Sequence, residues 1–265
     1  MACTVQRVPP YAHPRMTPPE SSSQRAETIV GLVGGLGPQS TIDYYRRILA
    51  AWETHSPRTA PSLIIDSLDV WRALDLATNN PAGMVDYALA SLQRLARAGA
   101  DFAAITANTP HLVFDELAAR SSIPLISIVE TCADEAERRG VRRLGLLGSR
   151  FTMEGSFFAD VFARRGLEII VPDKASQELV HDRYVNQLLA GDFRDETRAE
   201  FVALVQRLHR DYAIDAVILG GTELPLLLRS TTVADVPVLD TTAIHVAAIV
   251  QRLWSPGLAG NSDPA

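Results

Sequence analysis

Short apolar runs alternate with amphipathic stretches of helical length along most of this chain. The runs "TIVGLVGG", "DFAAIT" and "DAVILG" each precede such a stretch, for example "STIDYYRRILAAW" after the first. Strands that are apolar at every position are buried on both faces, as in parallel sheets covered by helices. The alternation therefore predicts an α/β fold of parallel sheets flanked by helices, whose ligands bind at the carboxyl ends of the strands.

An internal repeat predicts that these elements form two similar lobes. With Asp101 aligned on Asp215, "DFAAITANTPHL" lies over "DAVILGGTELPL" without a gap. Each copy begins with Asp, continues as an apolar run, and is followed at nearly the same distance by an Ile-Pro or Val-Pro pair that opens another strand. We interpret the match as a duplication, with a pseudo-twofold axis and a cleft between the lobes. Ala107 and Gly221 are then equivalent positions on opposite walls.

The repeat also suggests lobe boundaries. We expect a first lobe over about 28–125, completed by a C-terminal helix at about 241–254, and a second lobe over about 126–240. The segments 1–27 and 255–265 are rich in Pro, Ser, Gly or charged residues, a composition that predicts a disordered leader and a flexible tail.

Composition limits the functional classes. The net charge of −6 argues against nucleic-acid binding, which needs clustered Lys and Arg. No segment has the apolar length of a membrane span, and the leader has no apolar core like that of a signal peptide. Two cysteines, Cys3 and Cys132, imply no disulfide framework. We therefore expect a cytoplasmic protein that binds neither nucleic acid nor membrane.

A glycine-rich turn, "GLVGGLGPQS", follows the first apolar run. Its spacing differs from the G-x-G-x-x-G pattern of dinucleotide sites, and no Gly-Lys-Ser/Thr of a P-loop follows. We interpret it as a turn for a small anion, in which Gly35 and Gly37 allow close approach to the backbone. Gln39, Ser40 and Thr41 offer side-chain hydrogen bonds beside it.

The segments "GLVGGLGPQSTIDYY", "AGADFAAITANTPH", "GLLGSRFTM", "VILGGTELPLLL" and "VLDTTAIH" together resemble the aspartate/glutamate racemase superfamily. The resemblance runs from Thr28 to Trp254 in order. It implies a two-lobed α/β enzyme that needs no cofactor or metal, is usually a homodimer, and holds a small-molecule carboxylate between its lobes.

The chain departs from the family pattern at the two positions that carry the family's chemistry. The first is usually Cys and sometimes Thr, the second usually Cys; here they are Ala107 and Gly221. Racemisation needs a proton removed from one face of a carbon and returned to the other, a task that suits thiolates. Because alanine and glycine do not titrate, the two-cysteine mechanism is unavailable. The missing side chains also predict a wider cleft and a substrate bulkier than aspartate.

The binding residues of the family pattern are retained. Two helices are expected to begin at the cleft, after Ala107 and Gly221, where free N–H groups favour a carboxylate or an enediolate. Any single Thr or Asn at such a place is also a common helix N-cap. The resemblance implies that the residues placed around the cleft bind substrate as a set: Asn108, Thr109, Thr222, Gly35, Gly37, Ser149 and Thr152.

Glu223 and His111 are the candidate catalytic residues. Glu223 matches the family's acidic residue. Two roles are equally favoured for it: a general acid or base, and a charge that complements a helix dipole. His111 matches the family's histidine, and we favour an orienting role over proton transfer.

Five further residues are considered for the cleft. Asp66 is expected to be a solvated loop residue, and Arg72 a surface residue that could pair with a distal carboxylate. Cys132 is expected to be a small apolar filler, although a helix N-terminus lowers a thiol pKa. His181 and Tyr184 occupy a family segment that borders the cleft.

Three hypotheses follow. The first is an enzyme with altered chemistry, such as decarboxylation, elimination, cyclisation or isomerisation through an enolate-like state. The second is a catalytically inactive carboxylate-binding protein. The third is a racemase that uses Glu223, His111 or another group in place of thiols.

Overall fold

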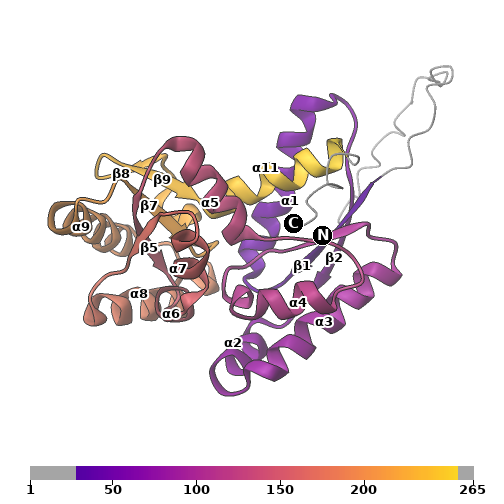
Figure 1. Cartoon of the computed structure of the whole chain (residues 1–265), viewed down its shortest axis with the longest axis horizontal. Coiled ribbons are helices and arrows are strands. Elements are labelled where there is room, and N and C mark those ends of the chain that lie inside the picture. Colours follow the sequence, from indigo (N-terminus) through magenta and orange to yellow (C-terminus); the bar gives the residue numbers. More distant parts are fainter. Residues whose placement is uncertain (1–27, 256–265) are drawn as a thin grey trace, which may run out of the picture.

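The computed structural model describes residues 28–255, which form two α/β lobes side by side (Figure 1). The expected leader and the part of the expected tail after Ser255 lie outside the described residues. The sheet of the first lobe is parallel, in the order β2-β1-β3-β4. Its strands are β1 (Ile29–Gly34), β2 (Ser62–Ser67), β3 (Phe102–Ile105) and β4 (Leu125–Ile126).

The second sheet repeats this order as β6-β5-β7-β9, with β8 added antiparallel at the edge. Its strands are β5 (Arg143–Gly148), β6 (Glu168–Ile170), β7 (Ala216–Gly220), β8 (Thr232–Val233) and β9 (Val236–Asp240). The expected fold class, two similar lobes of parallel sheets flanked by helices, is confirmed.

The aspartates that begin the two sequence repeats have the same structural role. Asp101 Oδ2 accepts a hydrogen bond from the N–H of Ile29 at 2.7 Å, and Asp215 Oδ2 accepts one from the N–H of Arg143 at 2.8 Å. Each carboxylate thus binds the first residue of the central strand beside it. Because β3 and β7 start from equivalent points, Ala107 and Gly221 follow equivalent strands.

Side-chain alternation explains why both faces of each sheet are covered. On β1, Val30 and Leu32 pack with α1 (Pro38–His55), whereas Val33 packs with α3 (Pro81–Arg97). Successive strand residues point to opposite faces, so a strand that is apolar throughout needs a helix on each side.

Two helices cross between the lobes. α5 (Ile128–Arg139) follows the last strand of the first sheet but packs on the second, with Cys132 in its core. α11 (Thr241–Trp254) follows β9 and returns to the first sheet, where it lies beside α1 (Figure 1). The exchange joins the two cores through buried surface on both sides.

The remaining helices surround the two sheets. Within residues 28–255, none of the helices combines the length and the apolar character that a membrane span requires. They are α2 (Val70–Asn79), η1 (Thr109–Val113), α4 (Phe114–Arg120), α6 (Arg150–Glu154), α7 (Ser156–Ala163), α8 (Lys174–Asn186), η2 (Leu188–Ala190), α9 (Asp195–Tyr212) and α10 (Leu224–Leu228).

The helices at the cleft are shorter than the sequence predicts. The turn after Ala107 is the 3₁₀ segment η1, and α4 starts only at Phe114. On the other wall, α10 has five residues and starts at Leu224, after Glu223. Pro110 and Pro225 lie in these first turns and lack N–H groups, so each N-terminus offers fewer donors than expected.

Candidate active site

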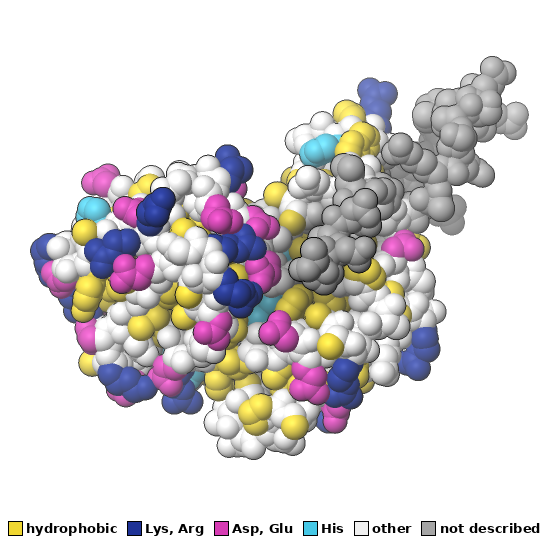
Figure 2. Space-filling view, in the orientation of Figure 1, with side chains coloured by type: hydrophobic (Ala, Val, Ile, Leu, Met, Phe, Trp, Pro, Cys, Tyr) yellow, Lys and Arg dark blue, Asp and Glu magenta, His cyan; other side chains and the backbone are white. Residues whose placement is uncertain are grey.

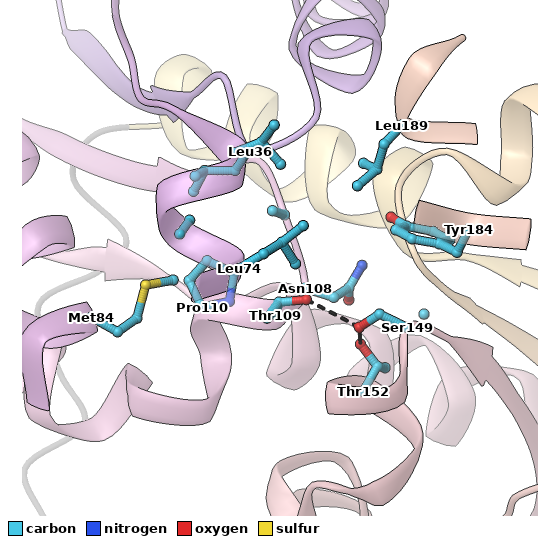
Figure 3. Close-up of a pocket in the computed structure, with 14 residues that line it drawn as sticks. Leu36, Leu74, Met84, Asn108, Thr109, Pro110, Ser149, Thr152, Tyr184 and Leu189 are labelled. Carbon is cyan, nitrogen blue, oxygen red and sulfur yellow. Dashed lines mark hydrogen bonds between the residues drawn. The ribbon is translucent and has the colours of Figure 1, made fainter. Parts of the chain in front are cut away.

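A small cavity lies between the lobes at the carboxyl ends of the central strands (Figure 3). Its volume is about 30 Å³, room for about two water molecules. The cleft is therefore nearly closed in this conformation. The cavity is lined by Leu36, Val70, Ala73, Leu74, Met84, Ala107, Asn108, Thr109, Pro110, Ser149, Thr152, Tyr184, Leu189 and Gly220.

Three hydroxyl groups on one side of this cavity connect the two lobes. Thr109 Oγ1 of the first lobe lies 3.2 Å from Ser149 Oγ of the second, which lies 3.3 Å from Thr152 Oγ1 (Figure 3). Hydroxyls donate and accept, so this chain of three can turn its protons toward an anion. The structure thus brings together three of the residues predicted to bind substrate.

Asn108, also predicted to bind substrate, has an unused acceptor beside this group. Thr241 donates its hydroxyl to the carbonyl of Leu219 at 2.7 Å, so its oxygen accepts from Asn108 Nδ2 at 3.4 Å. That contact orients the amide and leaves Asn108 Oδ1 buried with no hydrogen-bond partner among the described residues. A ligand that donates an N–H group would satisfy this oxygen.

The two walls differ at the positions where the family pattern has cysteine. Ala107 lines the cavity with its methyl group. At Gly221 a side chain would meet Tyr184: a Cβ there would lie 3.0 Å from both Cζ and the hydroxyl oxygen, and nearer still to Cε2. The expectation of a wider cleft is therefore wrong on this wall, because the phenol ring fills the space that a thiol would need.

Glu223 lies behind Tyr184 and outside the cavity lining. Its side chain is fully buried and accepts hydrogen bonds from Ser40 Oγ at 2.5 Å, from the Tyr184 hydroxyl, and from Thr222 Oγ1 at 3.3 Å. Burial raises the pKa of Glu223, and the three donors partly oppose that rise. The candidate acid-base residue thus reaches the cavity through the Tyr184 hydroxyl. Thr222 also lies behind the lining.

The glycine turn holds this carboxylate in place. Gly35 and Gly37 have φ angles of 79° and 132°, which favour glycine. A Cβ at Gly37 would overlap Glu223 Oε1. The N–H of Gly35 already donates to Thr41 Oγ1 at 2.8 Å. The turn therefore accommodates the carboxylate of Glu223 rather than a free anion, and Leu36 is its only residue in the cavity lining given above.

His111 is fixed by its two ring nitrogens. Nε2 accepts from the N–H of Ile128 at 3.2 Å, so Nδ1 carries the proton and donates to the carbonyl of Ala107 at 3.1 Å. Burial lowers the pKa of His111 to about 3. A neutral imidazole held in this way orients the backbone of Ala107 and does not line the cavity.

The chain is similar to known proteins in both sequence and structure. Residues 33–249 match a protein family described as Asp/Glu/Hydantoin racemase. The chain belongs to this family. It is 25% identical over 227 residues to the broad specificity amino-acid racemase RacX of Bacillus subtilis (strain 168). The match covers 81% of this chain and 93% of RacX.

Solved structures show the same relationship. An aspartate racemase homologue from Pyrococcus horikoshii OT3 has 31% sequence identity and a TM-score of 0.71, over 86% of this chain and 99% of the other. The aspartate racemase of Picrophilus torridus has 19% identity and a TM-score of 0.73, over 86% and 94% of the two chains. The second likeness concerns the fold alone.

Most of the other predicted candidates of this racemase-family member lie away from the cavity. Asp66 pairs with Arg94, their closest N and O atoms 2.7 Å apart. The guanidinium of Arg72 lies 4.6 Å from the ring centre of Tyr87. Neither residue lines the cavity given above.

Cys132 and His181 are also engaged elsewhere. Cys132 is fully buried in the core of the second lobe, and this burial raises the pKa of its thiol. His181 Nδ1 accepts from the N–H of Arg150 at 3.2 Å. Among residues 28–255, no three His, Cys, Asp or Glu side chains form a group that could hold a metal ion.

Sequence reasoning gave Tyr184 no specific role. The sequence held one signal for such a role: Gly221 lacks a side chain on one wall, and Tyr184 lies in a segment that borders the cleft. It also missed the apolar walls formed by Leu36, Leu74 and Leu189, which are ordinary core residues in the sequence.

Proposed function

We propose that this chain acts on the carbon beside the carboxylate of a small acid and moves a proton on one face of that carbon, through an enolate-like state. Tyr184 is the proton carrier, with Glu223 as its partner. One observation carries the proposal: the Tyr184 ring stands where a side chain at Gly221 would be, and its hydroxyl donates to a buried carboxylate. The sulfur missing from this wall is thus replaced by an oxygen that can relay a proton.

The proton path needs no other group. The Cα–H bond of the substrate breaks, its electron pair remains as the enolate, and its proton moves to the Tyr184 oxygen. In the same step the phenol proton moves along the existing hydrogen bond to Glu223 Oε2. The negative charge of Glu223 thereby passes to the enolate. Burial raises the pKa of Glu223 and so makes it a stronger base than a solvated carboxylate.

The polar groups of the cavity suit the rest of such a substrate. Thr109, Ser149 and Thr152 can donate to a carboxylate and to the negative charge that develops on it. Asn108 Oδ1 needs a donor, which an ammonium or amide N–H beside the reacting carbon would supply. The supported substrate is therefore a 2-amino acid or an N-substituted relative.

The opposite wall restricts the outcome. Ala107 has no group that takes or gives a proton, and His111 behind it is held neutral and engaged on both nitrogens. A proton removed on the Tyr184 face returns on that face unless another bond breaks first. The geometry therefore supports one-face exchange, elimination, decarboxylation or isomerisation over two-base racemisation.

Proton nuclear magnetic resonance in heavy water tests this proposal. The full chain is incubated with a panel of 2-amino acids and small 2-substituted acids, and loss of the α-proton signal is followed together with chirality. We expect exchange or bond cleavage without inversion, abolished by Tyr184→Phe. Tyr45→Phe is the control, because Tyr45 lies exposed on α1, 43% accessible. Racemisation by the unmodified chain would contradict one-face chemistry.

Ligand binding without exchange would favour the second candidate, a carboxylate-binding protein without activity. The absence of a titratable group at both Ala107 and Gly221 favours that candidate. Thermal shift of the unmodified chain and of Tyr184→Phe with the same panel separates it from the first. For a pure binder, the two proteins keep their ligand preferences and neither exchanges the α-proton.

A further inference from the structure

A second, larger cavity adjoins the catalytic cavity. Its volume is about 430 Å³, within the range of small-molecule pockets, which hold roughly 300–1,000 Å³. Its lining comes from α2, the start of α3, the end of η1, and α6 of the second lobe. On the face shown in Figure 2, hydrophobic side chains gather where α2 approaches the second lobe.

The two cavities share a wall at Met84. This side chain is 2% exposed and lines both of them. Along α2, Ala73 and Leu74 line the catalytic cavity, and one turn further Ala77 and Thr78 line the second. A methionine is unbranched and adapts its shape readily, so Met84 is a movable divider between two adjoining spaces.

The sizes of the two cavities are complementary. The cavity beside Asn108 has a volume of about 30 Å³, which is about the size of a carboxylate group alone. The remainder of any larger substrate needs a continuous space, and the second cavity provides one across Met84. Its walls there are apolar, with Pro81, Leu112 and Val113 among them.

Arg150 adds an uncompensated positive charge to this second cavity. Its guanidinium lies 5.7 Å from the ring centre of Phe151, and among the described residues no carboxylate forms an ion pair with it. Glu154, the acidic residue of the lining, is paired with Lys174. The cavity is thus apolar along its length and cationic at one point.

We propose that the second cavity receives the far part of the substrate, an apolar chain or ring that passes Met84 and ends in an anionic group at Arg150. The inference rests on the proposed function, because it extends the same site. It defines the substrate class as acids with a reactive carboxylate end, an apolar middle and a distal anion.

Calorimetric titration of the full chain tests the inference. The probes are α,ω-dicarboxylates of four, six and eight carbons and the monocarboxylates of the same lengths. We expect affinity to rise with length, by about fourfold for each methylene that enters the cavity. The longest dicarboxylate should bind more tightly than its monocarboxylate.

Substitutions locate the effect. Arg150 is exposed, so Arg150→Gln should lower the affinity for the longest dicarboxylate by up to about fivefold, the upper end of the range for an exposed ion pair, and leave the monocarboxylates unchanged. Arg97→Gln is the matched control, because Arg97 is exposed at the end of α3, away from the cavity. Met84→Ala removes the divider and should favour the longer acids. Equal affinity at all lengths, or no effect of Arg150→Gln, overturns the inference.

The two proposals fail separately. If short acids lose their α-proton only when Tyr184 is present, while binding shows no length dependence, the chemistry stands and the second cavity is not part of the site. If long dicarboxylates bind through Arg150 but no acid exchanges its α-proton, the cavity assignment stands and the proposed chemistry is wrong.

Discussion

The ring of Tyr184 fills the space that a side chain on Gly221 would need. Its Cζ and hydroxyl oxygen lie 3.0 Å from the Cβ position of Gly221, although the two residues come from different elements, α8 and the turn after β7. The missing side chain at Gly221 and the aromatic ring of Tyr184 are therefore two parts of one structural feature. Substitutions at the two positions should not act independently.

Gly221→Cys should destabilise the protein, because the added atoms overlap Tyr184. We expect a loss of about 2 kcal/mol in the free energy of unfolding, typical of overpacking in a buried site. Ala107→Cys is the matched control and should cost less, since Ala107 borders the cavity. Urea denaturation measures both. Combining Gly221→Cys with Tyr184→Ala should recover part of the loss, and additive effects would contradict the overlap.

Glu223→Gln should remove proton transfer and preserve the fold. The glutamine amide has the size of the carboxylate. It also keeps the hydrogen bonds to Ser40 and Tyr184, because their hydroxyl groups can rotate to match an amide. Because it cannot accept the phenol proton, α-proton exchange should fall by about 100-fold or more, the scale of general acid-base catalysis. Unchanged ligand affinity in calorimetry should accompany the loss. Retained exchange would show that Tyr184 works without Glu223.

The sequence predicted the parts of this fold that depend on local pattern. The alternation of apolar runs identifies the parallel strands, and the match of Asp101 with Asp215 identifies the repeat. The grouping of Asn108, Thr109, Ser149 and Thr152 followed from family resemblance together with strand ends. The strands and the repeat follow from the chain's own pattern, the grouping also needs the family resemblance, and none of them needs knowledge of how helices pack on one another.

The role of Tyr184 depends instead on tertiary packing. The placement of α8 against the turn after β7 brings together residues 37 positions apart, and no periodicity in the sequence encodes that contact. The same holds for Glu223, whose side chain turns toward Ser40 of the other lobe. The near closure of the cavity likewise arises from side chains of both lobes.

Gly37→Ala should impair activity more than its backbone strain alone explains. The new methyl group overlaps Glu223 Oε1 and should displace the carboxylate from Ser40 and Tyr184. Gly99→Ala is the matched control: Gly99 also has a positive φ, 98°, but nothing lies within 4 Å of its Cβ position. Backbone strain of about 1 kcal/mol is expected in both variants. Equal α-proton exchange rates in the two variants would contradict a role for Glu223.

Stability should fall as the solution is acidified, because two histidines are buried in neutral form. Burial lowers the pKa of His245 from 6.5 to about 4 and that of His111 from 6.5 to about 3. Both histidines contribute their full stability above pH 6.5, where they are neutral in the folded and in the unfolded chain. Below it the unfolded chain takes up protons first, so stability is lost progressively as the pH falls through the folded pKa values.

Each histidine should contribute a slope of up to about 1.4 kcal/mol per pH unit in this window. The buried Glu223 acts in the opposite sense, since its pKa is raised from 4.5 and its contribution declines as the pH rises above that value. Urea denaturation at intervals between pH 7 and 4 measures the sum. In His245→Gln the amide can donate to the carbonyl of Ile126, as the ring does at 3.1 Å, without titrating. The slope of stability against pH should therefore be smaller in this variant by up to one proton. An unaltered slope in His245→Gln would assign the acid sensitivity to other groups.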